Sequence, residues 1–216
     1  MAARALIEHR PWLVGALSAA IAYYSLRSGS HNEWAILVLK GCAVGCLAAY
    51  AWRRGRGFNA SLLTAVMVCA AIADMVVEKD LISGGGVFLI SNSLAIILYL
   101  RNRRNVLAGS QKLAAAMMVL FIPIIAWLLT QNIGVTLYSI ILGAMAGAAW
   151  TSVFSRYRVG IGAVLFVISD LLIFWNFGSD AGEAAAGLFV WPCYFVGQLL
   201  IATAIVQQSR KALAAK

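Results

Sequence analysis

Two aspartates lie inside apolar stretches of the sequence, where a carboxyl group is expected to have a binding partner or a function. Asp170 interrupts the stretch GAVLFVISDLLIFWNF at 162–177, and Asp74 lies near the end of the apolar stretch 60–78. A charged side chain at the centre of a bilayer costs about 2.5–3.5 kcal/mol on insertion scales. Apolar surroundings disfavour the charged form of a carboxyl group, so an acid placed there can stay protonated near neutral pH. The two residues are therefore candidates for acid–base catalysis.

Further polar side chains lie in apolar segments of the same kind: Lys40, Glu78, Asn92, Tyr194 and Gln198. At about 1.5 Å of helix per residue, they and the two aspartates fall at mid-membrane or in its outer half. The cytoplasmic half of the same helices is nearly free of polar residues. Tyr194 and Gln198 are four residues apart and share a helix face. We expect one polar pocket that opens toward the outer leaflet.

Most of these residues also have a purely structural explanation. Lys40 can extend to the outer surface or form an ion pair with one of the aspartates. Glu78 lies near the interface, where water can solvate it. Asn92 can hydrogen-bond a neighbouring helix, and Tyr194 can serve in packing. Asp170 is the hardest to explain in this way, because its short side chain does not reach the surface from its depth.

The composition places these residues in a membrane. Hydrophobic residues make up 62% of the 216 positions and charged residues only 12%, with a mean hydropathy of +0.87. A soluble domain carries about 25% charged residues. A membrane-crossing helix needs about 20 mostly apolar residues. Eight segments qualify: 11–27, 34–52, 60–78, 84–100, 113–130, 134–154, 159–177 and 186–207. We expect an all-α polytopic bundle of eight transmembrane helices that forms a single integral membrane domain over residues 1–216.

The basic residues predict the orientation of this bundle. Fourteen of the seventeen Lys and Arg residues fall in the two termini and the even-numbered loops, among them Arg4, Arg104 and Lys216. The opposite loops hold only Arg27 and Lys79. Because basic loops stay in the cytoplasm, we expect both termini to be cytoplasmic. The net charge of +9 follows from this pattern, so nucleic acid is not an expected partner. The short, arginine-rich loops favour the bacterial inner membrane.

The glycines predict local packing and one turn. The pairs Gly41/Gly45 and Gly143/Gly147 have the small-xxx-small spacing that allows close contact between membrane helices. The stretch SGGGV at 83–87 predicts a tight turn between the third and fourth helices.

Metal chemistry is not expected. A catalytic zinc takes about three protein ligands, commonly histidine, and the chain has only His9 and His31, both outside the apolar segments. This excludes a zinc-dependent membrane hydrolase and leaves no metal and no other cofactor in the prediction.

Two motifs resemble the signature of the YhhN family. GAVLFVISDLLI at 162–173 is followed by YFVGQLLIA at 194–202. The positions that match the family pattern are Gly162, Phe166, Ser169, Asp170, Tyr194 and Gln198. The resemblance covers nearly the whole chain, including its eight-helix length.

The resemblance extends to three other helices, with departures. Lys40 matches a lysine of the second helix, but Gly41 stands where a proline usually follows. In ADMVV, Ala73 and Asp74 match the family's GD. The family's FLxxH becomes FLISN, so that Asn92 replaces a typical histidine.

Characterised members of this family are lysoplasmalogenases, so the resemblance implies hydrolysis of the vinyl-ether bond of a lysoplasmalogen. Such an ether is cleaved when an acid protonates its β carbon, giving an oxocarbenium ion that water captures. A second, ionised carboxylate stabilises the cation and takes a proton from the water, as paired carboxylates do at a glycosidic bond. Asp74 and Asp170 would fill these roles in either order, and Lys40 would meet the substrate phosphate.

In this reading the lysophospholipid substrate enters sideways from the bilayer, and Tyr194, Gln198, Asn92 and Glu78 line its site. The main alternative is a membrane transporter or a lipid- or ion-binding protein that uses the same buried Asp and Lys residues, since such residues also mark ion pathways. Against a transporter, no apolar segment is interrupted by glycine and proline breaks, and Pro123 is the single candidate kink. A purely structural membrane protein is the third possibility. The head group, chain length and oligomeric state are not encoded in the motifs.

Overall fold

The computed structural model describes residues 10–29, 32–178 and 183–214, and these residues are almost entirely helical. The helices are α2 (Arg10–Leu26), α3 (Glu33–Arg54), α4 (Phe58–Val77), α5 (Leu81–Arg101), α6 (Gly109–Thr130), α7 (Ile133–Thr151), the π-helical turn η1 (Arg156–Gly160), α8 (Ile161–Gly178) and α9 (Glu183–Ala214). Each of the eight predicted segments overlaps one α-helix. Arg4, His9, His31, Asp180 and Lys216 lie outside the described residues.

Within the described ranges, seven helices, α3 to α9, are long and apolar enough to cross a membrane. The apolar stretch of α2, Pro11–Leu26, is shorter. The prediction of an all-helical integral membrane protein is thereby confirmed. That α2 also crosses the membrane and that both termini are cytoplasmic stay predictions.

The chain divides into two units, which are described separately. We call Met1–Ser91 with Ile205–Lys216 the N-terminal unit, and Asn92–Ala204 the central unit. The boundaries fall inside α5 and α9, so each of these helices contributes to both units. The prediction of a single domain stays a prediction.

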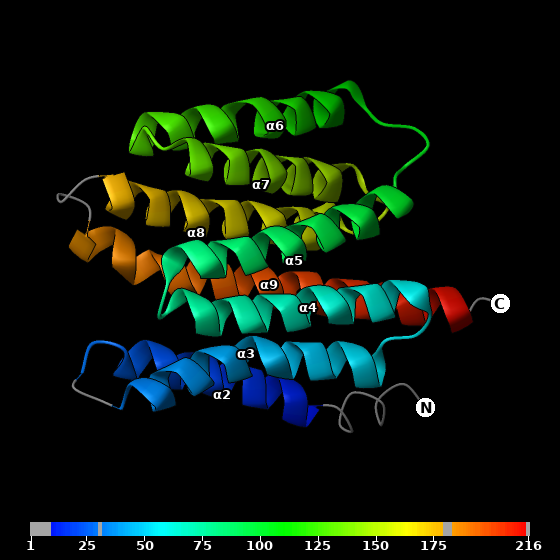
Figure 1. Cartoon of the computed structure of the whole chain (residues 1–216). Helices are drawn as coiled ribbons and strands as arrows, with labels where there is room; N and C mark the ends of the chain where they lie inside the picture. Colours follow the sequence, from blue (N-terminus) through cyan, green and yellow to red (C-terminus); the bar gives the residue numbers. More distant parts are fainter. Residues whose placement is uncertain (1–9, 30–31, 179–182, 215–216) are drawn as a thin grey trace. The chain divides into compact units, whose positions relative to one another are not determined.

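In the N-terminal unit, α3 packs against both α2 and α4 (Figure 1). The side chain of Asn32 caps the start of α3 by accepting a hydrogen bond from the backbone N–H of Trp34 at 2.9 Å. Gly57 precedes α4 with a φ of 74°, a conformation that glycine adopts without strain. A Cβ atom on Gly41 would lie 2.6 Å from the Met75 side chain, so glycine at this position lets α3 approach α4.

The predicted turn at 83–87 is wrong, because these residues form the first turns of α5. The chain reverses before them, and Asp80 starts the helix: its carboxylate accepts hydrogen bonds from the backbone N–H groups of Ser83 at 2.9 Å and Ile82 at 3.3 Å. The hydrogen bonds from Ser83 hold the pKa of the Asp80 carboxyl below its usual value. A Cβ on Gly84 would lie 2.6 Å from backbone atoms of Val77. Gly84 thus serves close packing of α5 on the end of α4.

In the central unit, α6, α7 and α8 lie side by side (Figure 1). A Cβ on Gly143 would lie 2.7 Å from the carbonyl oxygen of Met118, and one on Gly147 would lie 3.2 Å from that of Ala115. The predicted close contact through this glycine pair is confirmed, and the partner helix is α6. The outer face of α6 exposes large apolar side chains such as Leu120 and Leu128, as expected of a surface that faces lipid.

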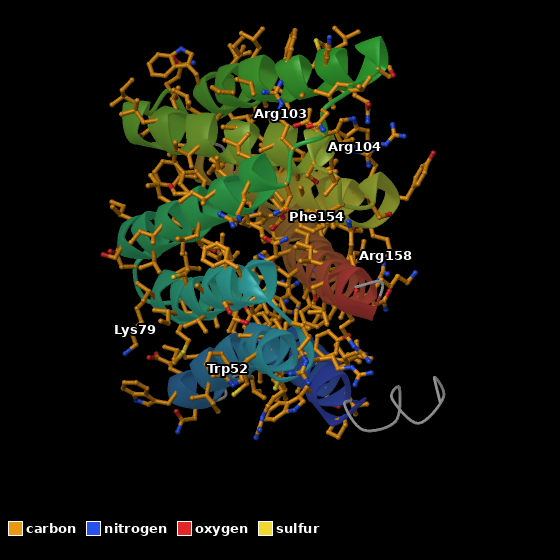
Figure 2. All side chains as sticks on the ribbon, turned by 90° about the vertical axis from the view of Figure 1, so that its right-hand side faces the viewer. Trp52, Lys79, Arg103, Arg104, Phe154 and Arg158 are labelled. Carbon is orange, nitrogen blue, oxygen red and sulfur yellow. The ribbon has the colours of Figure 1, made fainter. Side chains whose placement is uncertain are left out.

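Arg104 joins two loops at one end of the central unit (Figure 2). Its Nε donates to the carbonyl oxygen of Ser152 at 2.6 Å, and a terminal nitrogen donates to that of Phe154 at 3.1 Å. Arg103 and Ser152 form an isolated antiparallel bridge. The guanidinium therefore satisfies carbonyl groups that follow the end of α7, which would otherwise lack helical partners.

We expect Arg104→Gln to lower the free energy of unfolding by about 2 kcal/mol, because two hydrogen bonds from a charged donor are lost. For a chain of this size the melting temperature should fall by roughly 4–8 °C, measured in detergent. Arg103→Gln is the matched control, since it removes the same charge from an exposed neighbouring side chain. Equal shifts in both variants would show that charge, and not the loop contact, carries the effect.

Candidate functional site

The polar residues of the N-terminal unit meet at Glu78, which directly follows the last residue of α4. Its Oε1 accepts a hydrogen bond from the hydroxyl of Tyr23 at 2.7 Å. The same oxygen accepts a hydrogen bond from Lys40 Nζ at 2.6 Å, and the two side chains form an ion pair. Lys40 is only 9% exposed, and its ammonium lies 5.5 Å from the centre of the Tyr23 ring. Lys40 therefore does not extend freely to the surface, and Glu78 is paired rather than merely solvated.

Asp74 lies on α4 four residues before Glu78, so the two acids share a helix face. It is 2% exposed. Asp74 lies within α4 near its end, as its position in the apolar stretch 60–78 predicted. Its catalytic role stays a prediction.

The ion pair sets the charge of Glu78. Burial favours the neutral carboxyl, but the Lys40 ammonium and the Tyr23 hydroxyl outweigh burial and hold the pKa of Glu78 below its usual value of 4.5. A carboxylate with a lowered pKa stabilises the folded chain above the unfolded value, and this contribution is lost as the pH falls through the lowered pKa.

We expect Glu78→Gln to lower the free energy of unfolding at neutral pH by about 1–3 kcal/mol, because the charged partner of Lys40 is lost. The difference from the unmodified chain should shrink only as the pH falls below about 4.5. Thermal melting across this pH range measures it. Glu33→Gln, which changes an exposed acid of the same unit, is the control. A difference that persists unchanged at the lowest pH would contradict a role of the Glu78 charge.

The polar residues of the central unit form a chain of three side chains from three helices. Asn92 on α5 donates from Nδ2 to the hydroxyl oxygen of Tyr138 on α7 at 3.3 Å. That hydroxyl donates to Oδ2 of Asp170 on α8 at 2.7 Å. Asn92 is 2% exposed and Asp170 6% exposed. The structure thus connects two predicted site residues through a tyrosine that the sequence analysis did not select.

Aromatic rings on α7, α8 and α9 contact one another in this unit. The ring of Tyr138 meets Phe174 edge-to-face at 6.1 Å between centroids. Tyr194 contacts the rings of Phe166 and Trp191 at 5.5 and 5.7 Å. Tyr194 and Gln198 are both buried, in keeping with their predicted common face.

Two glycines bring α8 and α9 together near these rings. A Cβ on Gly162 would lie 2.7 Å from the carbonyl oxygen of Gly197, and a Cβ on Gly197 would lie 2.6 Å from that of Gly162. Neither helix could approach the other so closely with a larger residue at these positions. The contact sets the spacing of the helices that carry Asp170 and Tyr194.

The structure therefore brings Lys40 to Glu78 in one unit and Asn92 to Asp170 in the other. A single pocket that contains both aspartates stays a prediction. Tyr23 and Tyr138 were not among the predicted site residues, although Tyr194 was, because neither lies in the motifs that match the family pattern. Both lie near the same helix ends as the acids they contact, so tyrosines at matching depth were the available signal. In the described part of the chain, no group of three or more His, Cys, Asp or Glu side chains could hold a metal ion.

Comparison with known proteins gives one match. The family model described as the YhhN family matches residues 35–205. This range contains the predicted site residues from Lys40 to Gln198. No curated protein and no solved structure matches the chain.

Proposed function

The chain belongs to the YhhN family, and from this membership together with its buried acids we propose that it is a membrane-embedded hydrolase of lysoplasmalogens. It would cleave the vinyl-ether bond to a fatty aldehyde and a glycerophospho-alcohol. The observation that carries the proposal is Asp170, a buried carboxylate that accepts a hydrogen bond from Tyr138 within an apolar helix. Structural pairing alone would not require an acid at this depth.

The proposed reaction needs one proton donor and one proton acceptor. The donor protonates the β carbon of the vinyl ether, and the double-bond electrons leave an oxocarbenium ion at the α carbon. Water adds to that carbon and loses a proton to the acceptor. The resulting hemiacetal breaks its C–O bond to give the aldehyde and the alcohol. We assign the two roles to Asp74 and Asp170, both of which are buried.

The remaining predicted residues have supporting roles in this proposal. Lys40, which pairs with Glu78, would also meet the substrate phosphate with its positive charge. Asn92, Tyr194 and Gln198 would position substrate oxygens or water. The lysophospholipid would enter from the bilayer with its aliphatic chain among apolar helix faces. No cofactor has a part in these steps.

The first test is aldehyde release from lysoplasmalogens with choline or ethanolamine head groups by the purified protein in detergent. We expect Asp170→Asn and Asp74→Asn each to reduce the rate by at least about 100-fold, the usual contribution of a positioned acid or base. Asp80→Asn is the control, because it changes an acid outside the site and asparagine still caps α5. Melting temperatures report whether each variant is folded.

Unchanged rates of aldehyde release in both aspartate variants would contradict the catalytic roles proposed for Asp74 and Asp170. No aldehyde from the unmodified protein with either head group would remove the hydrolase itself. The ion pair between the buried Lys40 and the partly exposed Glu78 would then favour the transporter alternative, since ionisable residues of membrane helices also mark ion pathways. The same two aspartates would be the first residues to replace in transport assays.

A further inference from the structure

Tyr138 is the only side chain that links Asp170 to another helix among the hydrogen bonds of the described central unit. Its hydroxyl stands between two buried groups: Asn92 Nδ2 at 3.3 Å and Asp170 Oδ2 at 2.7 Å. The edge-to-face contact with Phe174 fixes the ring. The phenol is therefore held in place at both its ring and its oxygen.

The direction of the hydroxyl proton follows from the donors and acceptors. An amide nitrogen only donates, and a phenol has one proton of its own. Because the oxygen of Tyr138 accepts from Asn92, its proton is directed to Asp170. The distance of 2.7 Å is that of a well-formed O–H···O bond. The carboxyl oxygen that faces Tyr138 is therefore an acceptor.

A donor aimed at a carboxyl oxygen stabilises the ionised form of that group over the neutral form. We propose that Tyr138 is a positioning residue that favours the ionised form of Asp170, so that Asp170 is the proton acceptor of the reaction and Asp74 is the acid. This inference rests on the proposed function. It orders two roles that the sequence left open, and it adds a residue from α7 that the family motifs of this sequence do not include.

Because its other partner is Asn92, Tyr138 positions Asp170 and does not relay protons. An uncharged amide has no proton to give up at neutral pH, so no proton can continue from Tyr138 toward α5. A histidine is typical at this position of the family, and its imidazole could exchange protons with Tyr138. With Asn92, the charge of Asp170 depends on a fixed donor and does not follow the titration of a neighbour.

Few other titratable groups face Asp170 from the helices of the central unit. In the packed neighbours of α8, α7 carries only Tyr138 and α6 carries only Lys112, at its first turn. The turn η1 carries Arg156, Tyr157 and Arg158, which precede the first residue of α8, and Arg158 donates a hydrogen bond to Thr203. In α9 as far as Ala204, the titratable residues with described side chains are Cys193 and Tyr194, and the Tyr194 ring packs on Phe166 and Trp191. Tyr138 is thus the group whose removal should change the titration of Asp170.

The test compares Tyr138→Phe with Tyr99→Phe. Both changes remove one hydroxyl from the central unit, from the half-buried Tyr138 or the buried Tyr99, and keep a ring that packs edge-to-face on a phenylalanine, Phe174 or Phe154. Tyr138→Phe should lower kcat by about 10- to 100-fold, with KM nearly unchanged. The low-pH limb of its kcat profile should move to higher pH by roughly one to two units, because Asp170 needs a higher pH to ionise. Tyr99→Phe should change neither kcat nor its pH profile.

A lower kcat of Tyr138→Phe without a shift of the low-pH limb of the kcat profile, or equal effects in both variants, would overturn the proposal.

An infrared pH titration tests the same coupling without turnover. The carboxyl C=O band that disappears in Asp170→Asn belongs to Asp170. In Tyr138→Phe this band should persist to higher pH than in the unmodified protein and in Tyr99→Phe. If the unmodified protein releases no aldehyde, the hydrolase proposal fails while the infrared shift still decides whether Tyr138 controls Asp170. An unshifted band would overturn the role of Tyr138 even in an active enzyme.

Discussion

A carboxylate inside a membrane-length helix has no water to solvate it, and hydrogen-bond donors from the protein have to take the place of water. This requirement organises the polar interior of the central unit, and a related cluster lies at the end of α4 in the N-terminal unit. In the N-terminal unit the Tyr23 hydroxyl and the Lys40 ammonium meet Glu78, and in the central unit the Tyr138 hydroxyl meets Asp170. A tyrosine suits this task because it supplies a directed donor on an apolar ring and brings no charge of its own.

The two clusters differ in how the negative charge is balanced. Glu78 has a cation beside it, so the pair is nearly neutral and its charges are stable at neutral pH. The hydrogen bonds at Asp170 in the described central unit come from a neutral donor alone. A carboxylate balanced only by a neutral hydrogen bond can change its protonation at a lower cost than one locked in an ion pair. That difference makes Asp170 the better placed of the two for chemistry and gives Glu78 the more structural part.

The sequence predicted the helices more fully than the contacts among their side chains. Apolar length and flanking charges identify membrane helices because the bilayer imposes both, and so every predicted segment overlaps a helix. The turn at 83–87 was misjudged because glycine has two uses, and the Cβ-free surface of Gly84 serves packing against Val77. The burial of Asp170, Asn92 and Gln198 followed from their depth. Depth alone did not single out Tyr23 and Tyr138, because a tyrosine in an apolar helix is also typical of packing until its rotational position on the helix is known.

Arg104 shows how one residue can act at two stages in the life of a membrane protein. In the predicted orientation it belongs to the basic loops that we expect to stay in the cytoplasm while the chain inserts. In the folded chain its guanidinium is turned to the carbonyl groups of Ser152 and Phe154. Two of its N–H groups then donate to carbonyl oxygens of the protein, so the guanidinium cannot use all of its donors to bind a lipid phosphate. The exposed Arg103 next to it keeps that capacity. The number of basic residues in the loops therefore predicts the orientation of the chain during insertion. It overstates the number of donors that the folded protein presents to the lipid head groups.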